Sequence, residues 1–561
     1  MRRLSIKERV PTFSGAVMVA IATLLGGAGA TPAFGQNCTT GNDTWIGGSS
    51  GDWSVSSDWS LGEPSQTCSV SIESGASVIV DQGGSALNLN LGSGNSLTIA
   101  SSLNIYGSSI TNAGQIVIPP PTSDFGGASL NIESGTTTTL SGGSTVTLSA
   151  NSFGSDSIGG AGVGGTLMNE ETIEGSGGLD MTFNNASSGV INANDPSGYQ
   201  LVIGRNQAAS STNTGLIEAT DGGQLAMGSL TLNNVGGTIK ASGTNSLVQL
   251  EGEGQGGETF TGGTWTTASG GVIQVVDSTV LLDGTNGNTI TNSGTMQLPD
   301  GAPHPGGYFQ GTINNTGSIQ VLSKGSSFGI NITNGQTLTL MGKGNVTLGD
   351  GTNNSYNNDV SISGGTLVNQ QLIQGTGSIL NLTSFTNSSG ATINDNIPVG
   401  SANIQLQLGR AGASTNAGTI EASNGGGLVI GSTSITNTSG TIMATGSGSY
   451  VDLAGSLGTS GLSVSGGTYT TSSGGTIYAG GGTLLDGTGS NPITNSGLIL
   501  VDDYRNNAQM QGSVSNTGTI QMTSTGDEVS LCVPTGQTLT DRKSTRLNSS
   551  HCALSRMPSS A

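Results

Sequence analysis

The sequence predicts an all-β fold, a right-handed parallel β-helix (β-solenoid) with a Trp-rich cap at its N-terminal end. First, 97 of the 561 residues are Gly and only 9% are charged, which is unusual for an ordinary soluble domain and typical of long repetitive β-proteins. Second, similar segments return along the chain at a nearly constant distance. Third, short β-branched runs alternate with turns rich in Gly, Asn, Ser and Thr, and no amphipathic helical stripe develops.

Residues 1–35 are predicted to be a secretory signal peptide. Arg2, Arg3 and other basic residues come first, an apolar run follows from Ala16 to Leu25, and small residues come next. This order is typical of a cleaved export signal. The alternative is a membrane anchor, but the apolar run is short for a bilayer span. We therefore expect the mature chain to begin near residue 36, outside the cytoplasm.

Residues 36–80 are predicted to form the N-terminal cap. This segment holds three of the four Trp residues, at positions 45, 53 and 59. A solenoid needs such a cap to cover its terminal strands, and the alternative use of the Trp residues is stacking on sugars. Cys38 and Cys68 bracket the segment, and a disulfide between them is expected in an exported chain. Cys532 is then left over, and whether it pairs stays open, because its partner could lie in a missing C-terminal part.

Residues 81–540 are predicted to form the β-solenoid, built from internal repeats of about 200 residues. The repeats span about 135–335 and 336–536, and a truncated third begins after them. Three examples of matching segments are Gly165–Asn169 with Gly365–Asn369, Leu281–Thr285 with Leu484–Thr488, and Gly335–Thr339 with Gly536–Thr540.

A shorter beat inside each repeat predicts the turns of the coil. A polar pair and a Gly precede a brief β-branched run, as in Asn213–Ile217 and Asn416–Ile420. Gly and Asn suit sharp corners, and Asn residues at equivalent corners can form side-chain ladders. Turns of about 22 residues stacked at about 4.8 Å predict a rod on the order of 100 Å long. The alternative, an array of β-sandwiches, would need longer strands and a longer period.

Residues 541–561 are predicted not to belong to the natural protein. The run Asp541–His551 resembles the translation of a short-read sequencing adapter, and the last residues resemble the far side of the same adapter. Four basic residues fall in this short stretch although Lys and Arg are rare elsewhere. We therefore expect the gene to continue past Thr540. A genuine basic tail is the alternative.

The charge of the chain excludes one large class of function. The formal net charge is −20. Between residues 36 and 540 only six basic residues stand against 32 acidic ones, and they form no basic patch. Nucleic acids and anionic lipids would be repelled by such a chain. Solubility, or the attraction of cations and cationic surfaces, remains.

Catalytic chemistry has little support in the sequence. His304 stands between prolines and makes no nucleophilic triad, and no ligand spacing for a metal or calcium-binding repeat occurs, so we expect no cofactor, no metal and no catalytic residue. The densest acidic cluster is matched in the second repeat by glutamines, which cannot act as general acid or base, so a surface or ladder role is predicted. Its members and their counterparts are Glu170, Glu171 and Glu174, and Gln370, Gln371 and Gln374.

Two further recurrent positions have competing interpretations. Asp283 and Asp486 recur in the same Leu-Leu-Asp-Gly-Thr setting, which predicts a turn. Arg205 and Arg410 follow matching apolar runs. They could pair with neighbouring acids along the rod or serve as the arginine of a polysaccharide lyase.

The Trp-bearing start, with Asp43–Gly48 and Asp58–Gly62, and the Ser109–Gly114 type of beat resemble passenger domains of bacterial autotransporter-type surface proteins. This resemblance implies an exported β-helix held at the outer membrane by a missing C-terminal barrel or anchor. The expected function is non-enzymatic: adhesion or cell-envelope structure, with host or neighbouring cell surfaces or extracellular glycans as partners. A secreted polysaccharide lyase or hydrolase is the alternative, and a structural matrix component is the third hypothesis.

Overall fold

The computed structural model describes residues 37–555 with gaps at 122–126, 134, 152–153, 162–164, 205–209, 229, 252–256, 301–305, 323–326, 350–359, 400–404, 410, 432–433, 454–460, 503, 505–506, 525–528, 536, 542–545 and 549–551. The predicted signal peptide, residues 1–35, lies outside the described residues.

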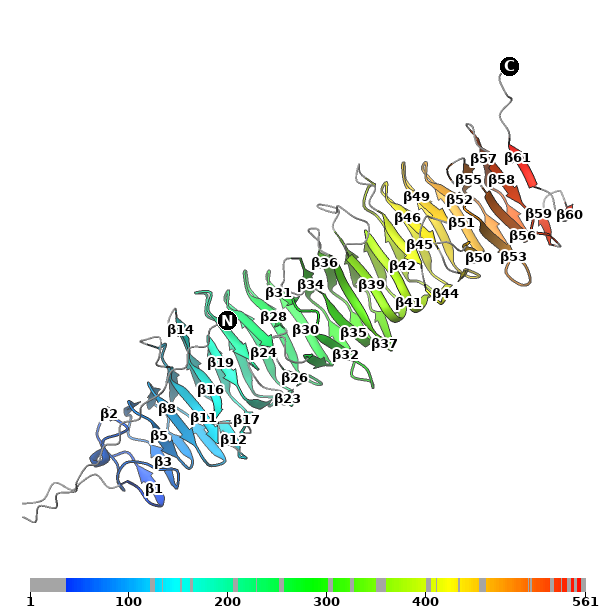
Figure 1. The fold of residues 1–561 in the computed structure, drawn as a ribbon. Coiled ribbons are helices and arrows are strands. Elements are labelled where there is room, and N and C mark those ends of the chain that lie inside the picture. Colours follow the sequence, from blue (N-terminus) through cyan, green and yellow to red (C-terminus); the bar gives the residue numbers. More distant parts are fainter. Residues whose placement is uncertain are drawn as a thin grey trace, which may run out of the picture.

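The predicted fold class is confirmed: the chain is an all-β parallel β-solenoid with 63% strand and 1% helix, and each of its ladders stacks about 20 strands. Figure 1 shows the turns stacked into one long rod that runs from the blue N-terminal strands to the red C-terminal strands. Most strands have only three to five residues, too few to persist alone, and these strands are held by parallel pairing with strands of the neighbouring turns. The right-handed sense of the coil stays a prediction.

Each turn contributes strands to three faces of the rod, which we number in chain order. Face one contains β1 (Gly41–Thr44), β3 (Cys68–Ile72), β6 (Leu89–Leu91), β9 (Ser109–Asn112), β12 (Thr137–Ser141), β17 (Thr166–Asn169), β20 (Thr182–Asn185), β23 (Ser210–Asn213), β26 (Thr231–Asn233), β29 (Thr259–Thr261), β32 (Leu281–Gly284), β43 (Leu406–Gly409), β46 (Gly427–Gly431), β49 (Tyr450–Leu453), β52 (Thr476–Ala479), β55 (Leu498–Asp502) and β57 (Thr519–Thr523).

Face two contains β2 (Ser50–Asp52), β4 (Ser77–Val80), β7 (Ser96–Ile99), β10 (Gln115–Ile118), β13 (Thr145–Leu148), β18 (Thr172–Gly175), β21 (Val190–Ala193), β24 (Leu216–Thr220), β27 (Thr238–Ser242), β30 (Gly263–Ala268), β33 (Ile290–Asn292), β44 (Ala413–Asn416), β47 (Ser434–Thr436), β50 (Ser463–Ser465), β53 (Thr483–Gly487) and β58 (Val529–Cys532).

Face three contains β5 (Gly84–Ala86), β8 (Ser102–Ile105), β11 (Ser129–Glu133), β16 (Ser157–Ala161), β19 (Gly177–Asp180), β22 (Gln200–Ile203), β25 (Gln224–Gly228), β28 (Leu247–Glu251), β31 (Val272–Val275), β34 (Thr295–Pro299), β36 (Ser318–Leu322), β38 (Asn345–Leu348), β40 (Leu372–Gly375), β42 (Thr392–Asp395), β45 (Thr419–Ser423), β48 (Thr441–Thr445), β51 (Gly467–Ser472), β54 (Ile493–Asn495) and β59 (Thr538–Asp541).

A few strands lie outside this simple pattern. Four of them continue from face one into face two: β35 (Gly307–Asn315), β37 (Phe328–Met341), β39 (Val360–Asn369) and β41 (Gly377–Asn387). Strand β56 (Asn507–Asn516) continues from face two into face three. Strands β14 (Ala150–Asn151) and β15 (Gly154–Ser155) form a small separate hairpin, and η1 (Ser56–Asp58) is a 3₁₀ turn.

The interior of the rod is one continuous apolar core. Along the strands, buried and partly exposed residues alternate, as in Thr172–Gly175 and Val190–Ala193. The inward Ile, Leu and Val side chains of successive turns pack into a single cluster from Trp45 to Val529. Alternation with a period of two is what a pleated strand requires, so the same residues that form the strands also build the core.

The predicted asparagine ladder is present at the corners. Asn169 donates from Nδ2 to Oδ1 of Asn185 at 2.8 Å, and Asn185 donates in the same way to Asn213 at 2.8 Å. Asn213 continues the column to Asn234 at 2.6 Å. These side chains are at most 1% exposed, so each amide satisfies its neighbour inside the rod, where an unpaired amide would be costly.

The long repeat is not an integral number of turns. Strand β24 lies in face two, but its sequence counterpart β45 lies in face three. Likewise β23 in face one corresponds to β44 in face two, and β25 in face three corresponds to β46 in face one. One repeat therefore covers a whole number of turns plus one face, and the second repeat is rotated by one face about the rod axis.

The parallel pairing stops near the position where the composition changes. Strands β58 and β59 are the last to continue the coil, and they pair antiparallel with β61 (Cys552–Ser555) and β60 (Arg546–Asn548). Cys532 lies opposite Cys552 in that register, and Cys532 is disulfide-bonded. The pairing of Cys532, which the sequence leaves open, is therefore settled for this chain: Cys532 takes part in a disulfide.

Candidate functional site

The acidic cluster of the first repeat does not form a paired catalytic site. Glu170 is exposed and Glu174 is half-buried, whereas Glu171 is buried at 3% exposure. Glu171 Oε2 accepts hydrogen bonds from Asn112 Nδ2 at 3.2 Å and from the Ser144 amide at 3.1 Å. Burial raises the pKa of Glu171 to about 7, against these hydrogen bonds. The side chain is thus part of the interior asparagine ladder, as the ladder interpretation predicted.

Gln371 occupies the matching place in the second repeat. Its Oε1 accepts a hydrogen bond from Asn315 Nδ2 at 3.2 Å, as Glu171 does from Asn112. Gln371 is also buried, at 5% exposure. A neutral amide and a protonated carboxyl group have nearly the same shape, so both repeats can use the same interior position.

The recurrent Asp-Gly-Thr positions form the turns that the sequence predicts. Asp283 Oδ1 accepts the amide of Thr285 at 2.9 Å, and Asp486 Oδ1 accepts the amide of Thr488 at 3.0 Å. An Asp that bonds the backbone two residues ahead is a turn-forming residue. Arg205, Arg410 and His304 lie outside the described residues, so their two interpretations stay predictions.

Asp395 is a buried carboxyl group that sequence reasoning missed. Register places it beside Ala422 of the next turn, as Ala193 in the first repeat is placed beside Ala219. Its carboxylate accepts the amides of Leu406 at 2.7 Å and Ile397 at 3.1 Å. Burial nevertheless raises its pKa to about 7. The only sequence signal was an Asp at a position where the other repeat has an inward Ala.

The Trp-rich cap is a buried cluster at the N-terminal end. Trp59 lies edge-on to Trp45 and Trp53, with ring centroids 5.1 and 4.9 Å apart. All three are at most 3% exposed, so their faces are not available for stacking on a sugar. They cover the first turns of the coil, whose strands β1 to β4 already belong to the ladders.

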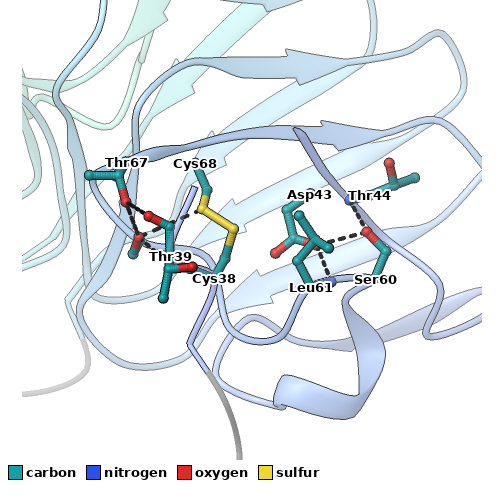
Figure 2. Close-up of a disulfide and its surroundings, with 9 residues drawn as sticks. Cys38, Thr39, Asp43, Thr44, Ser60, Leu61, Thr67 and Cys68 are labelled. Carbon is teal, nitrogen blue, oxygen red and sulfur yellow. Dashed lines mark hydrogen bonds between the residues drawn. A yellow bond between two sulfur atoms is a disulfide. The ribbon is translucent and has the colours of Figure 1, made fainter. Parts of the chain in front are cut away.

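The cap is closed by a disulfide and a carboxylate. Cys38 is bonded to Cys68, 30 residues further along the chain. In Figure 2, Thr67 Oγ1 donates to the Thr39 carbonyl at 2.7 Å beside the disulfide. Buried Asp43 accepts hydrogen bonds from the Ser60 hydroxyl and the Leu61 amide at 3.0 and 2.9 Å. These contacts tie the cap loop to the first two strands of face one.

The outer surface of the first repeat carries an open groove at the corner between faces two and three. Its cavity volume is about 640 Å³. Corner residues of four stacked turns and the starts of β25, β28 and β31 form it. The lining residues are Pro196, Asp221, Gly222, Gln224, Thr244, Asn245, Ser246, Leu247, Gly270, Val272 and Gln274.

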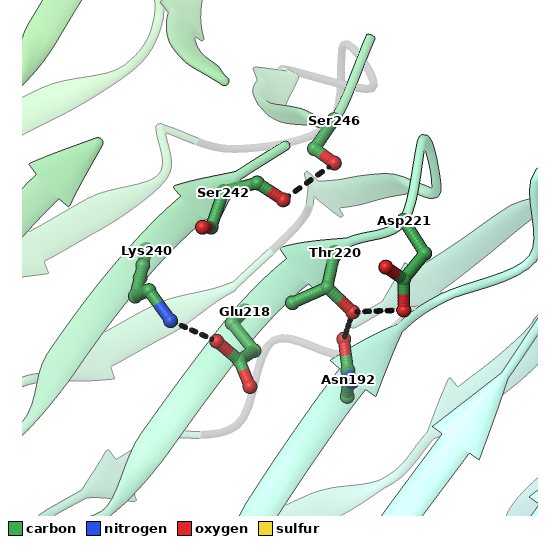
Figure 3. Close-up of polar contacts among 7 residues, drawn as sticks. All are labelled: Asn192, Glu218, Thr220, Asp221, Lys240, Ser242 and Ser246. Atoms are coloured by element: carbon green, nitrogen blue, oxygen red, sulfur yellow. Dashed lines mark hydrogen bonds and ion pairs between the residues drawn. The ribbon is translucent and has the colours of Figure 1, made fainter. Parts of the chain in front are cut away.

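The turns beside this groove are held by hydroxyl hydrogen bonds. Ser246 Oγ accepts the Gly222 amide at 3.0 Å and donates to the Ser242 carbonyl at 2.8 Å. Asp221 adopts the left-handed region at φ 55°, followed by Gly222 at φ 85°, which a sharp corner requires. Figure 3 shows Asp221, Ser242 and Ser246 at this corner, and the Lys240–Glu218 ion pair of 2.8 Å on the adjoining face.

Neither metal ligation nor a membrane-spanning helix is found within the described parts of the chain. No cluster of three or more His, Cys, Asp or Glu side chains there could hold a metal ion. None of the helices described is both long and apolar enough to cross a bilayer. Comparisons with protein-family models and with curated proteins found no match.

Proposed function

We propose that this chain is an exported surface protein that acts in adhesion or cell-envelope structure, similar to the passenger domain of an autotransporter. The observation that supports it most is the long rod of stacked turns, apolar inside and polar outside. Such a rod holds its outer surface at a distance from its attachment point. Many weak contacts along it add through multivalency. Host or neighbouring cell surfaces and extracellular glycans are the proposed partners.

We further propose that the function involves binding without catalysis. In support of this, the side chain of Glu171 lies inside the asparagine ladder, and its counterpart Gln371 cannot ionise. The Asp283 and Asp486 side chains accept hydrogen bonds from backbone amides of their own turns. A parallel β-helix is also compatible with a polysaccharide-active enzyme. Incubation with polygalacturonate should release no reducing or unsaturated sugar ends, and their release would favour the enzymatic alternative.

Adhesion is tested with the full chain immobilised on beads. The beads should attach to epithelial monolayers or to mucin-coated glass more often than beads carrying an unrelated acidic protein. Free chain in solution should compete for attachment. Attachment at the level of the unrelated protein would contradict the proposed function.

Export is tested separately by expressing the chain with and without residues 1–35 in a Gram-negative host. The complete chain should appear outside the cytoplasm, either at the surface or in the medium. The shortened chain should stay in the cytoplasm. Equal cytoplasmic retention of both would contradict the proposed localisation.

A further inference from the structure

The two repeats build the same corner but leave different space beside it. In the second repeat, Ser449 Oγ accepts the Gly425 amide at 2.8 Å and donates to the Thr445 carbonyl at 2.8 Å. Ser246 makes the same two contacts in the first repeat. A proline also flanks each corner: a Cβ built on Gly222 would lie 3.8 Å from Pro196 Cβ, and one built on Gly425 would lie 3.6 Å from Pro398 Cβ. The two repeats therefore share the backbone corner and the proline beside it.

The side chains beside this corner differ between the repeats. They leave an open groove in the first repeat and fill the space in the second. Gln224 and Leu247 of the first repeat correspond to Gly427 and Tyr450 of the second. The Tyr450 ring lies against the Gly427 backbone, where an added Cβ would be 2.6 Å from its Cζ, and the Tyr450 hydroxyl accepts a hydrogen bond from Gln405. In the second repeat the ring thus occupies the space that the first repeat leaves as a groove.

The open groove combines an apolar floor with uncharged polar walls. Leu247 and Val272 are neighbours in register on β28 and β31 and supply the apolar strip. The amides of Gln224 and Gln274 and the exposed side chain of Asn245 stand beside it. Ligand sites that pair an apolar surface with a few amides and hydroxyls can bind the ring face of a molecule while hydrogen-bonding its edge.

Charge and backbone pairing narrow the ligand class. Asp221 at the rim and the net charge of −20 disfavour an anionic polymer. The strands that border the groove are already paired on both sides, so a peptide cannot add to them as a further strand. Successive turns repeat at about 4.8 Å along the axis, which is close to the length of one pyranose ring, so a linear sugar chain would meet equivalent positions turn after turn.

We propose that this groove binds a linear, uncharged glycan whose sugar rings lie on Leu247 and Val272 and whose hydroxyl groups hydrogen-bond to Gln224, Asn245 and Gln274. The inference rests on the proposed adhesive function and names the surface and the ligand chemistry for it. Because the Tyr450 ring lies against the Gly427 backbone at the equivalent position, the second repeat serves as a natural comparison with a blocked surface. The first repeat is therefore the glycan-binding part of the rod.

The test uses the full chain in native gels that contain dextran, laminarin or mannan, with polygalacturonate as the anionic comparison. At least one neutral polymer should retard the natural chain. The double variant Leu247→Tyr with Gln224→Gly copies the second repeat, so it should fold, and it should bind at least tenfold more weakly. Gln320→Ala changes a glutamine of the same outward row, two turns beyond Gln274, and should bind like the natural chain.

The following outcomes would overturn the inference that the groove binds a glycan. Equal retardation of the double variant and the natural chain would overturn it, and so would retardation by polygalacturonate alone or by none of the polymers. Circular dichroism and urea unfolding of the double variant verify that a loss of binding is not a loss of fold; if it unfolds, Gln274→Ala alone should weaken binding several-fold. If bead adhesion persists in the double variant, the groove inference fails while the adhesive function stands.

Discussion

Asn185 illustrates how single residues hold the interior of the rod together. Its Nδ2 donates to Asn213 Oδ1 at 2.8 Å and to the carbonyls of Gly189 and Leu216, both at 3.1 Å. Asn185→Ala would remove these bonds and leave the Asn169 amide facing an apolar gap. We expect a loss of about 2 to 4 kcal/mol in the free energy of unfolding, measured by urea unfolding.

The preceding residue provides the control for this prediction. Asn184 lies on the outer side of the same strand, half-buried, and accepts one hydrogen bond from Thr212 Oγ1. Asn184→Ala should therefore cost less than about 1 kcal/mol. Equal effects of the two substitutions would mean that the interior column contributes no special stability.

Glu171 makes the stability of the rod depend on pH. Burial raises its folded pKa from 4.5 to about 7, so the folded state holds this proton more tightly than the unfolded chain. The contribution of Glu171 to the free energy of unfolding is therefore complete below pH 4.5 and is lost as the pH rises through about 7. Glu171→Gln copies Gln371 and should remove this loss, gaining about 2 to 3 kcal/mol at pH 8 and almost nothing at pH 4.

Urea unfolding at several pH values measures this difference. Glu170→Gln is the matched control, because that side chain is exposed on the next position of the chain. Its unfolding midpoints should follow those of the natural chain at each pH. A pH-independent difference between Glu171→Gln and the natural chain would contradict a buried, protonated carboxyl group at position 171.

Neighbouring strands of the two repeats differ in one ion pair. Glu218 on β24 faces Lys240 on β27, with Oε2 and Nζ 2.8 Å apart. In the second repeat Glu421 faces Met443 instead, and burial raises the pKa of Glu421. Met443→Lys should restore the pair, lower the pKa of Glu421 and add less than about 1 kcal/mol at pH 7. An NMR titration of the Glu421 carboxyl should show the shift, and an unchanged pKa would contradict the pairing.

The cap strands depend on the Cys38–Cys68 disulfide. Closing a loop of this length contributes about 3 to 4 kcal/mol by the chain-entropy estimate. In a solenoid each turn contacts only its neighbours, so Cys38→Ser with Cys68→Ser should speed amide exchange in β1 to β4 and leave β24 to β28 unchanged. Hydrogen exchange with mass spectrometry measures this. Faster exchange along the entire rod would show that the turns unfold as one unit.

At the scale of the molecule, scattering in solution should report a thin rod. Face one stacks 21 strands in one parallel ladder, and at about 4.8 Å per strand they give a length of about 100 Å. The pair-distance distribution should be skewed, with a single cross-section along its length. A profile typical of a flexible chain, or of separate globules, would contradict the continuous core.

Much of this architecture was predictable from the sequence because each strand has a recognisable pattern within its own few residues. Runs such as Thr172–Gly175 alternate inward and outward residues, and Asn at a strand end predicts the ladder. The face on which a strand lies was not predictable, since it depends on how many strand positions precede it. Strand β37, for example, covers two faces, with a shift in register between Ile332 and Thr337.

The groove was hidden from the sequence for a related reason. Gln224, Leu247 and Val272 come from three different turns and meet only because those turns stack in register. Asp395 is similar, because its inward direction depends on the pairing of β42 with β45. By contrast, the turn role of Asp283 was predictable, since the residues that it contacts are adjacent in the chain.

The rotation of the second repeat by one face also constrains how such a chain can change its length. Removing or inserting one complete unit would turn everything downstream to point in a new direction, and only three units together would restore the original heading. Recombination between units would therefore change the direction in which the outer surface of the last turns faces, while the packing inside the rod would stay the same. A family of chains with different copy numbers would point the same motif at different neighbours.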